Sequence, residues 1–305
     1  MNLSKFPLTK PLVDKFRESV SGDKDGRPDW VRSIAEGDDE GLFGPESAVW
    51  QVHGTIATLV GGIRALLLQA CHPAPLSGVA EHSRYETDPL GRLAGTTRWL
   101  TLTTFASKEV LEREAARVNA MHSHVKGDYT SKSGEMKAYK ASDPRYLLWV
   151  HCAFTDSFLT AHQSLGYPID KGADAYVREW SKSAIALGLT SAPQSVAELN
   201  ATMDNFRANE LAASAKTPEV VRFILNPPFG PFGKRFYRIL CNAAISTLHP
   251  NELRILGLKP RSVIWRKITK VFLDIFMVML GGQSPSQMEA IIRCNRIRAA
   301  KQSDQ

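Results

Sequence analysis

The chain has 305 residues but only four cysteines, and no two of them stand in the close spacing of a metal-binding or redox pair. Cys71, Cys152 and Cys241 fall within apolar segments, as buried free thiols of a reducing compartment do. A disulfide framework and a cysteine-ligated zinc site are therefore not expected.

Long uninterrupted apolar runs are also missing. The first 24 residues are polar, so no signal peptide is predicted. The apolar stretch at 48–70 carries Gln51, His53 and Arg64, and a charge at that depth argues against a membrane span. Together with the cysteines, these features favour a cytoplasmic protein.

The sequence contains no Gly-x-Ser-x-Gly motif, no phosphate-binding glycine loop and no convincing strand alternation. Its net charge of +7 is concentrated from Arg222 onward, where 14 lysines and arginines accompany only 4 aspartates and glutamates. No nucleic-acid-binding motif accompanies this charge, so we expect no nucleic-acid partner. A membrane surface or an acidic partner would fit it better.

What is present is helical periodicity, which predicts an all-α fold in one large bundle. Apolar residues repeat at helical spacing from Val49 to Leu67, and Gly61 and Gly62 in the middle of that helix would allow close approach of a neighbour. We expect a loop around Pro73, Pro75 and Gly78. The other predicted helices span about 89–105, 108–125, 144–165, 173–187, 217–225, 234–247, 261–281 and 285–301, and Ser195 with Glu198 predicts a capping box at the start of one more. A polar loop is predicted over 127–142.

Three parts of the chain are expected from the composition. Residues 1–44 form a polar N-terminal arm with one short helix near Trp30, and residues 45–225 form the core helical domain. Residues 226–305 form C-terminal helices that pack on the core. The proline- and glycine-rich segment 226–233 is the predicted hinge between the last two parts.

Two histidines are predicted to point inward from separate helices. His122 shares a stripe with Leu111, Ala115, Val118 and Val125, and His151 shares one with Leu147, Thr155 and Phe158. A single core histidine is usually a hydrogen-bonded structural residue. An imidazole on an apolar helical wall is also what an axial haem ligand requires. Arg92 and Thr96 share a helix face, where Arg92 could pair with a haem propionate.

A second set of residues is His72, His82 and Glu86. These are the ligand types of a two-histidine, one-carboxylate non-haem iron site. Because prolines and glycine surround them, the alternative is a polar loop capped by its own hydrogen bonds.

Several motifs together resemble the MpaB-like oxygenase family, which is related to the bacterial latex-clearing proteins. They are Gly-Gly-Ile-Arg-Ala-Leu-Leu-Leu-Gln-Ala-Cys-His-Pro at 61–73, Glu-His-Ser-Arg-Tyr-Glu-Thr-Asp-Pro-Leu-Gly-Arg-Leu at 81–93, Met-His at 121–122 and Trp-Val-His at 149–151. The resemblance covers roughly residues 45–260. It implies a globin-like bundle around a haem-sized pocket, a b-type haem, and oxidative cleavage of an isoprenoid double bond with dioxygen.

The resemblance also implies residue roles. His122 would be the proximal haem ligand, with Arg92 and Thr96 on the distal side. A lysine of the latex-clearing pattern is replaced here by Gly95. The sixth iron position would therefore be open, or filled by His72, His82 or His151.

Three hypotheses follow. The first is a haem-dependent oxygenase acting with dioxygen on an apolar, isoprenoid-like or lipid-like substrate. The second is a non-haem metal enzyme using His72, His82 and Glu86. The third is a non-catalytic helical protein that binds haem or lipid. The basic, apolar segment 261–282 is expected to be a core helix, and the alternative is a peripheral membrane contact.

Overall fold

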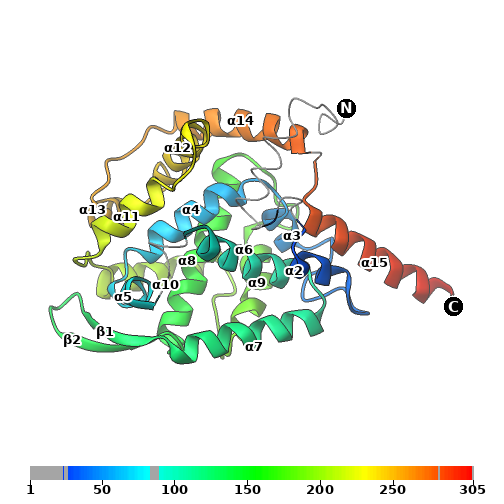
Figure 1. Cartoon of the computed structure of the whole chain (residues 1–305), viewed down its shortest axis with the longest axis horizontal. Coiled ribbons are helices and arrows are strands. Elements are labelled where there is room, and N and C mark those ends of the chain that lie inside the picture. Colours follow the sequence, from blue (N-terminus) through cyan, green and yellow to red (C-terminus); the bar gives the residue numbers. More distant parts are fainter. Residues whose placement is uncertain (1–22, 24–26, 83–88, 281, 304–305) are drawn as a thin grey trace.

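The computed structural model describes residues 23, 27–82, 89–280 and 282–303 (Figure 1). Within these ranges nearly all regular structure is helical, so the all-α prediction is confirmed. The four cysteines are free and buried, as expected for Cys71, Cys152 and Cys241. Among the described residues, none of the helices has the length and apolar character needed to cross a bilayer.

The first half of the chain differs from the prediction at two places. The long helix predicted over 49–67 is divided into α3 (Ala48–His53) and α4 (Thr58–Gln69), because the chain turns at Gly54 and the Thr55 hydroxyl donates to the carbonyl of Val52. The loop predicted at 73–78 is wrong, since α5 spans Pro73–His82. Prolines are tolerated there because the first turn of a helix needs no backbone donor.

The next two helices form as predicted, α6 over Pro89–Phe105 and α7 over Lys108–His124. The polar loop predicted over 127–142 is wrong. It is a hairpin of β1 (Lys126–Thr130) and β2 (Met136–Lys140), which pair antiparallel with a turn at Gly134, where φ is +87°. Most hairpin residues are exposed, and Tyr139 is the one buried residue of the two strands, so the sequence shows no apolar alternation that would predict them.

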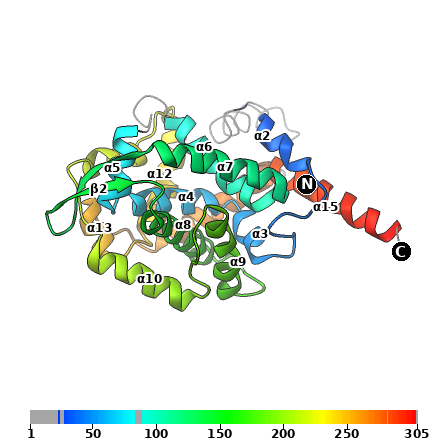
Figure 2. The ribbon, with the colours of Figure 1, turned by 90° about the horizontal axis from the view of Figure 1, so that it is seen from below.

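The centre of the molecule is α8 (Pro144–Ser164), which lies against α4 and is flanked by α9 (Ala173–Ala186) and α10 (Val196–Asn209), as Figure 2 shows. The Asp143 side chain accepts a hydrogen bond from the backbone of Arg145 and so begins α8 as predicted. Gly61 lets α4 and α8 approach closely, because a Cβ there would lie 2.5 Å from Cδ1 of Phe158.

The C-terminal part contains α11 (Thr217–Leu225), α12 (Pro231–Ile245), α13 (Pro250–Leu256), α14 (Ile264–Leu280) and α15 (Pro285–Ser303). The short α13 was not predicted. Helix α12 packs on both α4 and α14, while α15 packs on α6 and on the short helices α2 (Asp29–Arg32) and η2 (Ser33–Ala35). The division at residues 45 and 226 stays a prediction.

Candidate active site

His122 lies near the C-terminal end of α7, after the buried residues Leu111, Ala115 and Val118 on the same stripe. The side chain is half-buried, and its Nδ1 is buried without a hydrogen-bond partner among the described residues. Burial lowers the pKa of His122, so the imidazole is neutral at physiological pH. A neutral ring with an unused nitrogen is the form that a metal ligand requires.

A short connection at Ala106 and Ser107 joins α6 to α7, and Arg98 of α6 pairs with the buried Glu114 of α7 at 2.8 Å. Arg92 and Thr96 precede Arg98 on α6. Thr96 is half-buried, and the side chain of Arg92 lies outside the described residues.

Gly95 lies between these two positions on α6. A Cβ at Gly95 would meet no atom within 4 Å, so open space adjoins the helix there. The missing side chain is the one that the lysine of the latex-clearing pattern would supply. The surface of α6 is therefore open at Gly95, next to Thr96.

His72 is fully buried, and both of its ring nitrogens are engaged. Nδ1 accepts a hydrogen bond from the backbone of Ala74 at 3.2 Å, so Nε2 carries the proton and contacts Glu210 Oε2 at 3.1 Å. Arg145 also binds Glu210, at 2.8 Å. Burial lowers the pKa of His72 although Glu210 opposes this shift. In this arrangement His72 has no nitrogen left for a metal.

His151 lies on α8 and is buried against α9. Its Nε2 is 3.4 Å from the hydroxyl of Thr155, and its Nδ1 is 3.5 Å from that of Ser183. Each hydroxyl already donates its proton to a backbone carbonyl at 2.7 Å, so both can only accept from His151. Because a neutral imidazole has one N–H, one nitrogen of His151 lacks a donor.

The structure does not bring His72 and His151 together. His72 contacts Trp149 of α8, with ring centroids 5.7 Å apart, and His151 follows two positions later on another side of that helix. His82 is the last residue of α5, but its side chain lies outside the described residues, as does all of Glu86. Among the described residues, no group of three metal-binding side chains gathers.

The buried histidines that were not proposed as ligands have partners at both nitrogens. His53 contacts the hydroxyls of Thr104 and Tyr176 at 2.8 and 2.9 Å. His162 contacts the hydroxyl of Thr55 and the carbonyl of Pro168 at 3.2 and 2.9 Å. These rings have the hydrogen bonds of structural residues, in contrast to His122.

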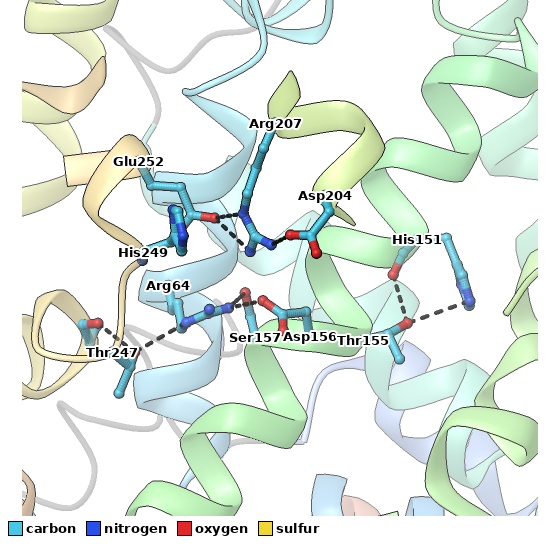
Figure 3. Close-up of polar contacts among 11 residues, drawn as sticks. Arg64, His151, Thr155, Asp156, Ser157, Asp204, Arg207, Thr247, His249 and Glu252 are labelled. Carbon is cyan, nitrogen blue, oxygen red and sulfur yellow. Dashed lines mark hydrogen bonds and ion pairs between the residues drawn. The ribbon is translucent and has the colours of Figure 1, made fainter. Parts of the chain in front are cut away.

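The sequence analysis did not predict a network of buried charged and polar side chains that joins α4 to α8 (Figure 3). Arg64 of α4 is 3% exposed and donates to Asp156 at 2.6 Å, to Ser157 at 3.0 Å and to Thr247 at 3.1 Å. The sequence contains one indication of this network. Arg64 and Asp156 each stand among apolar residues of a predicted helix. A buried charge needs a partner, so the two should have been paired.

The comparison with protein families agrees with the motifs. The model described as "ER-bound oxygenase mpaB/B'/Rubber oxygenase, catalytic domain" matches residues 50–280, a range that contains every candidate residue named above. No curated protein and no solved structure matches the chain. The chain therefore belongs to the mpaB and rubber oxygenase catalytic-domain family, and it is an oxygenase.

Proposed function

We propose that this oxygenase holds a b-type haem through His122 and acts with dioxygen on an apolar, isoprenoid-like or lipid-like substrate. The observation that carries the proposal is the Nδ1 atom of His122, which is buried and has no hydrogen-bond partner among the described residues. His53, His72 and His162 use both ring nitrogens in contacts, and His151 places both of its nitrogens near hydroxyls. Of these five histidines, His122 alone combines a neutral ring with a buried nitrogen that no described group contacts.

When bound, the haem iron would supply the activation of dioxygen. Arg92 would hold a propionate by a charge-assisted pair, and the Thr96 hydroxyl would donate a hydrogen bond on the distal side. Open space at Gly95 leaves room for a flat group or a substrate beside α6. His151 is our second candidate for a residue that contacts the cofactor, because its two hydroxyl partners leave one of its ring nitrogens without a hydrogen-bond donor.

The family description supports the substrate class, since it names a rubber oxygenase, an enzyme whose substrate is a hydrocarbon. The stripe that leads to His122 is apolar, with Leu111 and Val118 both buried. Such a substrate partitions into lipid, and we propose a peripheral membrane contact through residues 261–282.

The first experiment concerns haem retention. We expect His122→Ala to lose the Soret absorption of protein produced with haem, while keeping its helical circular dichroism. The matched control is His124→Ala on the same helix, which is exposed and should retain haem. Full haem retention in His122→Ala would remove this residue from the role.

Metal analysis of the purified wild-type protein separates the remaining alternatives. Iron with a Soret band supports the proposal, and consumption of dioxygen with an isoprenoid substrate distinguishes an enzyme from a binding protein. Iron without a Soret band would instead favour the non-haem hypothesis with His72, His82 and Glu86.

A further inference from the structure

Helix α14 presents two apolar faces on opposite sides. One face packs into the core, where Thr269 and Leu273 are completely buried. The opposite face is exposed along the whole helix, with side chains that are between 41% and 61% exposed: Ile264, Ile268, Val271, Ile275 and Val278. We call these five residues the apolar stripe. Figure 1 shows α14 along one edge of the molecule.

The spacing of the stripe is regular. Its members follow one another at intervals of four, three, four and three residues, so they form one continuous line on the helix surface. From Ile264 to Val278 the line is about 21 Å long. A monomeric protein rarely exposes a contiguous apolar surface of this kind without a partner.

Positive charge surrounds the N-terminal end of the stripe. Residues 254–280 contain six basic residues and one acidic residue, a net charge of +5. The acidic residue, Asp274, is already paired with Lys270 at 2.7 Å. Lys259, Arg261 and Lys267 are exposed.

A groove of about 430 Å³ lies between the end of α12, α13 and the segment that leads into α14. Its walls are mostly apolar, and its lining residues include Arg254 and Arg261 together with Ile245, Leu248, Leu253 and Leu258. The groove thus combines apolar walls with two guanidinium groups, which suits an anionic headgroup above acyl chains.

We propose that the apolar stripe, with the cations at its N-terminal end, docks flat on a bilayer surface containing anionic phospholipid. The stripe would enter the boundary between headgroups and acyl chains, and Arg261 and Lys267 would contact headgroup phosphates. The charge decides between this occupant and a second copy of the chain. A second copy would bring the same excess of positive charge to the interface, whereas an anionic surface neutralises it.

This inference specifies the membrane contact proposed above, and it does not depend on haem. A protein that binds haem but no vesicle would refute the docking surface alone. A protein that binds vesicles but no haem would refute the cofactor alone.

The test is flotation of the full-length protein with phosphatidylcholine vesicles that contain or lack phosphatidylserine. We expect binding to the anionic vesicles only, and we expect it to weaken as ionic strength rises. Val271→Ser combined with Ile275→Ser should lower the partition coefficient by about tenfold or more. The matched control is Met136→Ser with Ile185→Ser, which removes two exposed apolar side chains from β2 and α9 and should bind as the wild type does.

A second pair of variants tests the charge. Arg261→Gln with Lys267→Gln should also weaken binding about tenfold or more, and Lys171→Gln with Lys182→Gln should not. Equal binding to neutral vesicles, or no binding to either kind, would overturn the proposal. So would a dimer in solution that the stripe variant dissociates, because the stripe would then belong to a second copy.

Discussion

At the scale of single residues, the histidines of this protein differ in the hydrogen bonds that they make. His53 and His162 are fully supplied with partners, His72 pairs with Glu210, and His122 has a buried nitrogen with none among the described residues. From the sequence alone, His122 and His151 are both predicted on the apolar face of a helix, so the sequence does not distinguish them. Hydrogen bonding, rather than position on a helix, separates the candidate ligand from the structural residues.

The buried histidines also predict how stability depends on pH. Burial lowers the pKa of His53 to about 3 and that of His151 to about 4, from an ordinary value of 6.5. Between about pH 4 and 6.5 the unfolded state therefore binds protons that the folded state does not. Stability is fully present above pH 6.5 and falls as the pH drops, by about 1.4 kcal/mol per pH unit for each histidine.

Urea unfolding over this pH range checks the prediction. His151→Gln should reduce the pH dependence of the free energy of unfolding by the contribution of one proton. An unaltered pH dependence in His151→Gln would show that His151 is protonated in the folded protein.

At the scale of elements, the contact between α4 and α8 depends on one of two adjacent glycines. A Cβ at Gly61 would lie 2.5 Å from Cδ1 of Phe158 and 3.2 Å from its Cα, so the backbone of α8 blocks it. A Cβ at Gly62 would meet nothing within 4 Å. The sequence predicts close approach at this pair of glycines, and the structure shows which of them permits it.

We expect Gly61→Ala to destabilise the protein by about 1–3 kcal/mol through overpacking. Gly62→Ala, one residue away, should stabilise it by about 0.5–1 kcal/mol, because alanine favours the helix. The free energies of unfolding of the two variants in urea measure this contrast. Equal effects would mean that α4 and α8 do not meet at Gly61.

Sequence reasoning succeeded where a helix buries a continuous stripe, as in α8 and α9, or begins at a clear cap such as Asp143. It failed where tertiary contacts determine the secondary structure of a segment. The sequences of strands β1 and β2 show no alternation of apolar and polar residues, and helix α13 has only seven residues. Ser195 accepts from Glu198, as a capping box requires, but the Glu198 side chain binds Gln194 and not Ser195. Half of that predicted capping box is therefore absent.

The candidate site was predictable in its residue types but not in its hydrogen bonds. His122, His151 and Thr96 occupy the helices that were predicted for them, whereas His82 ends a helix where a loop was predicted. The partner of His72 is Glu210, which lies 138 residues further along the chain. Nothing local in the sequence indicates that pairing, because it arises only when the fold brings the residue before α5 next to the end of α10.

At the scale of the whole molecule, the two ends of the described chain close on each other. Helix α15 packs against α2, η2 and α6, and both α15 and the segment 29–46 lie outside the residues matched by the family model. Arg293 of α15 is completely buried and joins three segments by donating to the backbone carbonyls of Asp39, Ile34 and Phe105. Phe105 is the last residue of α6, the helix that carries Arg92 and Thr96.

The packing of the two chain ends against each other therefore depends on Arg293. Arg293→Ala leaves buried carbonyls without donors, each at a cost of about 1–3 kcal/mol, so we expect a total loss of several kcal/mol. Arg298→Ala on the same helix removes an exposed ion pair with Glu40, which solvent screens, and should change the stability far less than Arg293→Ala does. Thermal unfolding measures both. A small effect of Arg293→Ala would show that α15 adds little to the fold. A large one, accompanied by loss of the proposed haem, would show that the chain ends support the candidate site through α6.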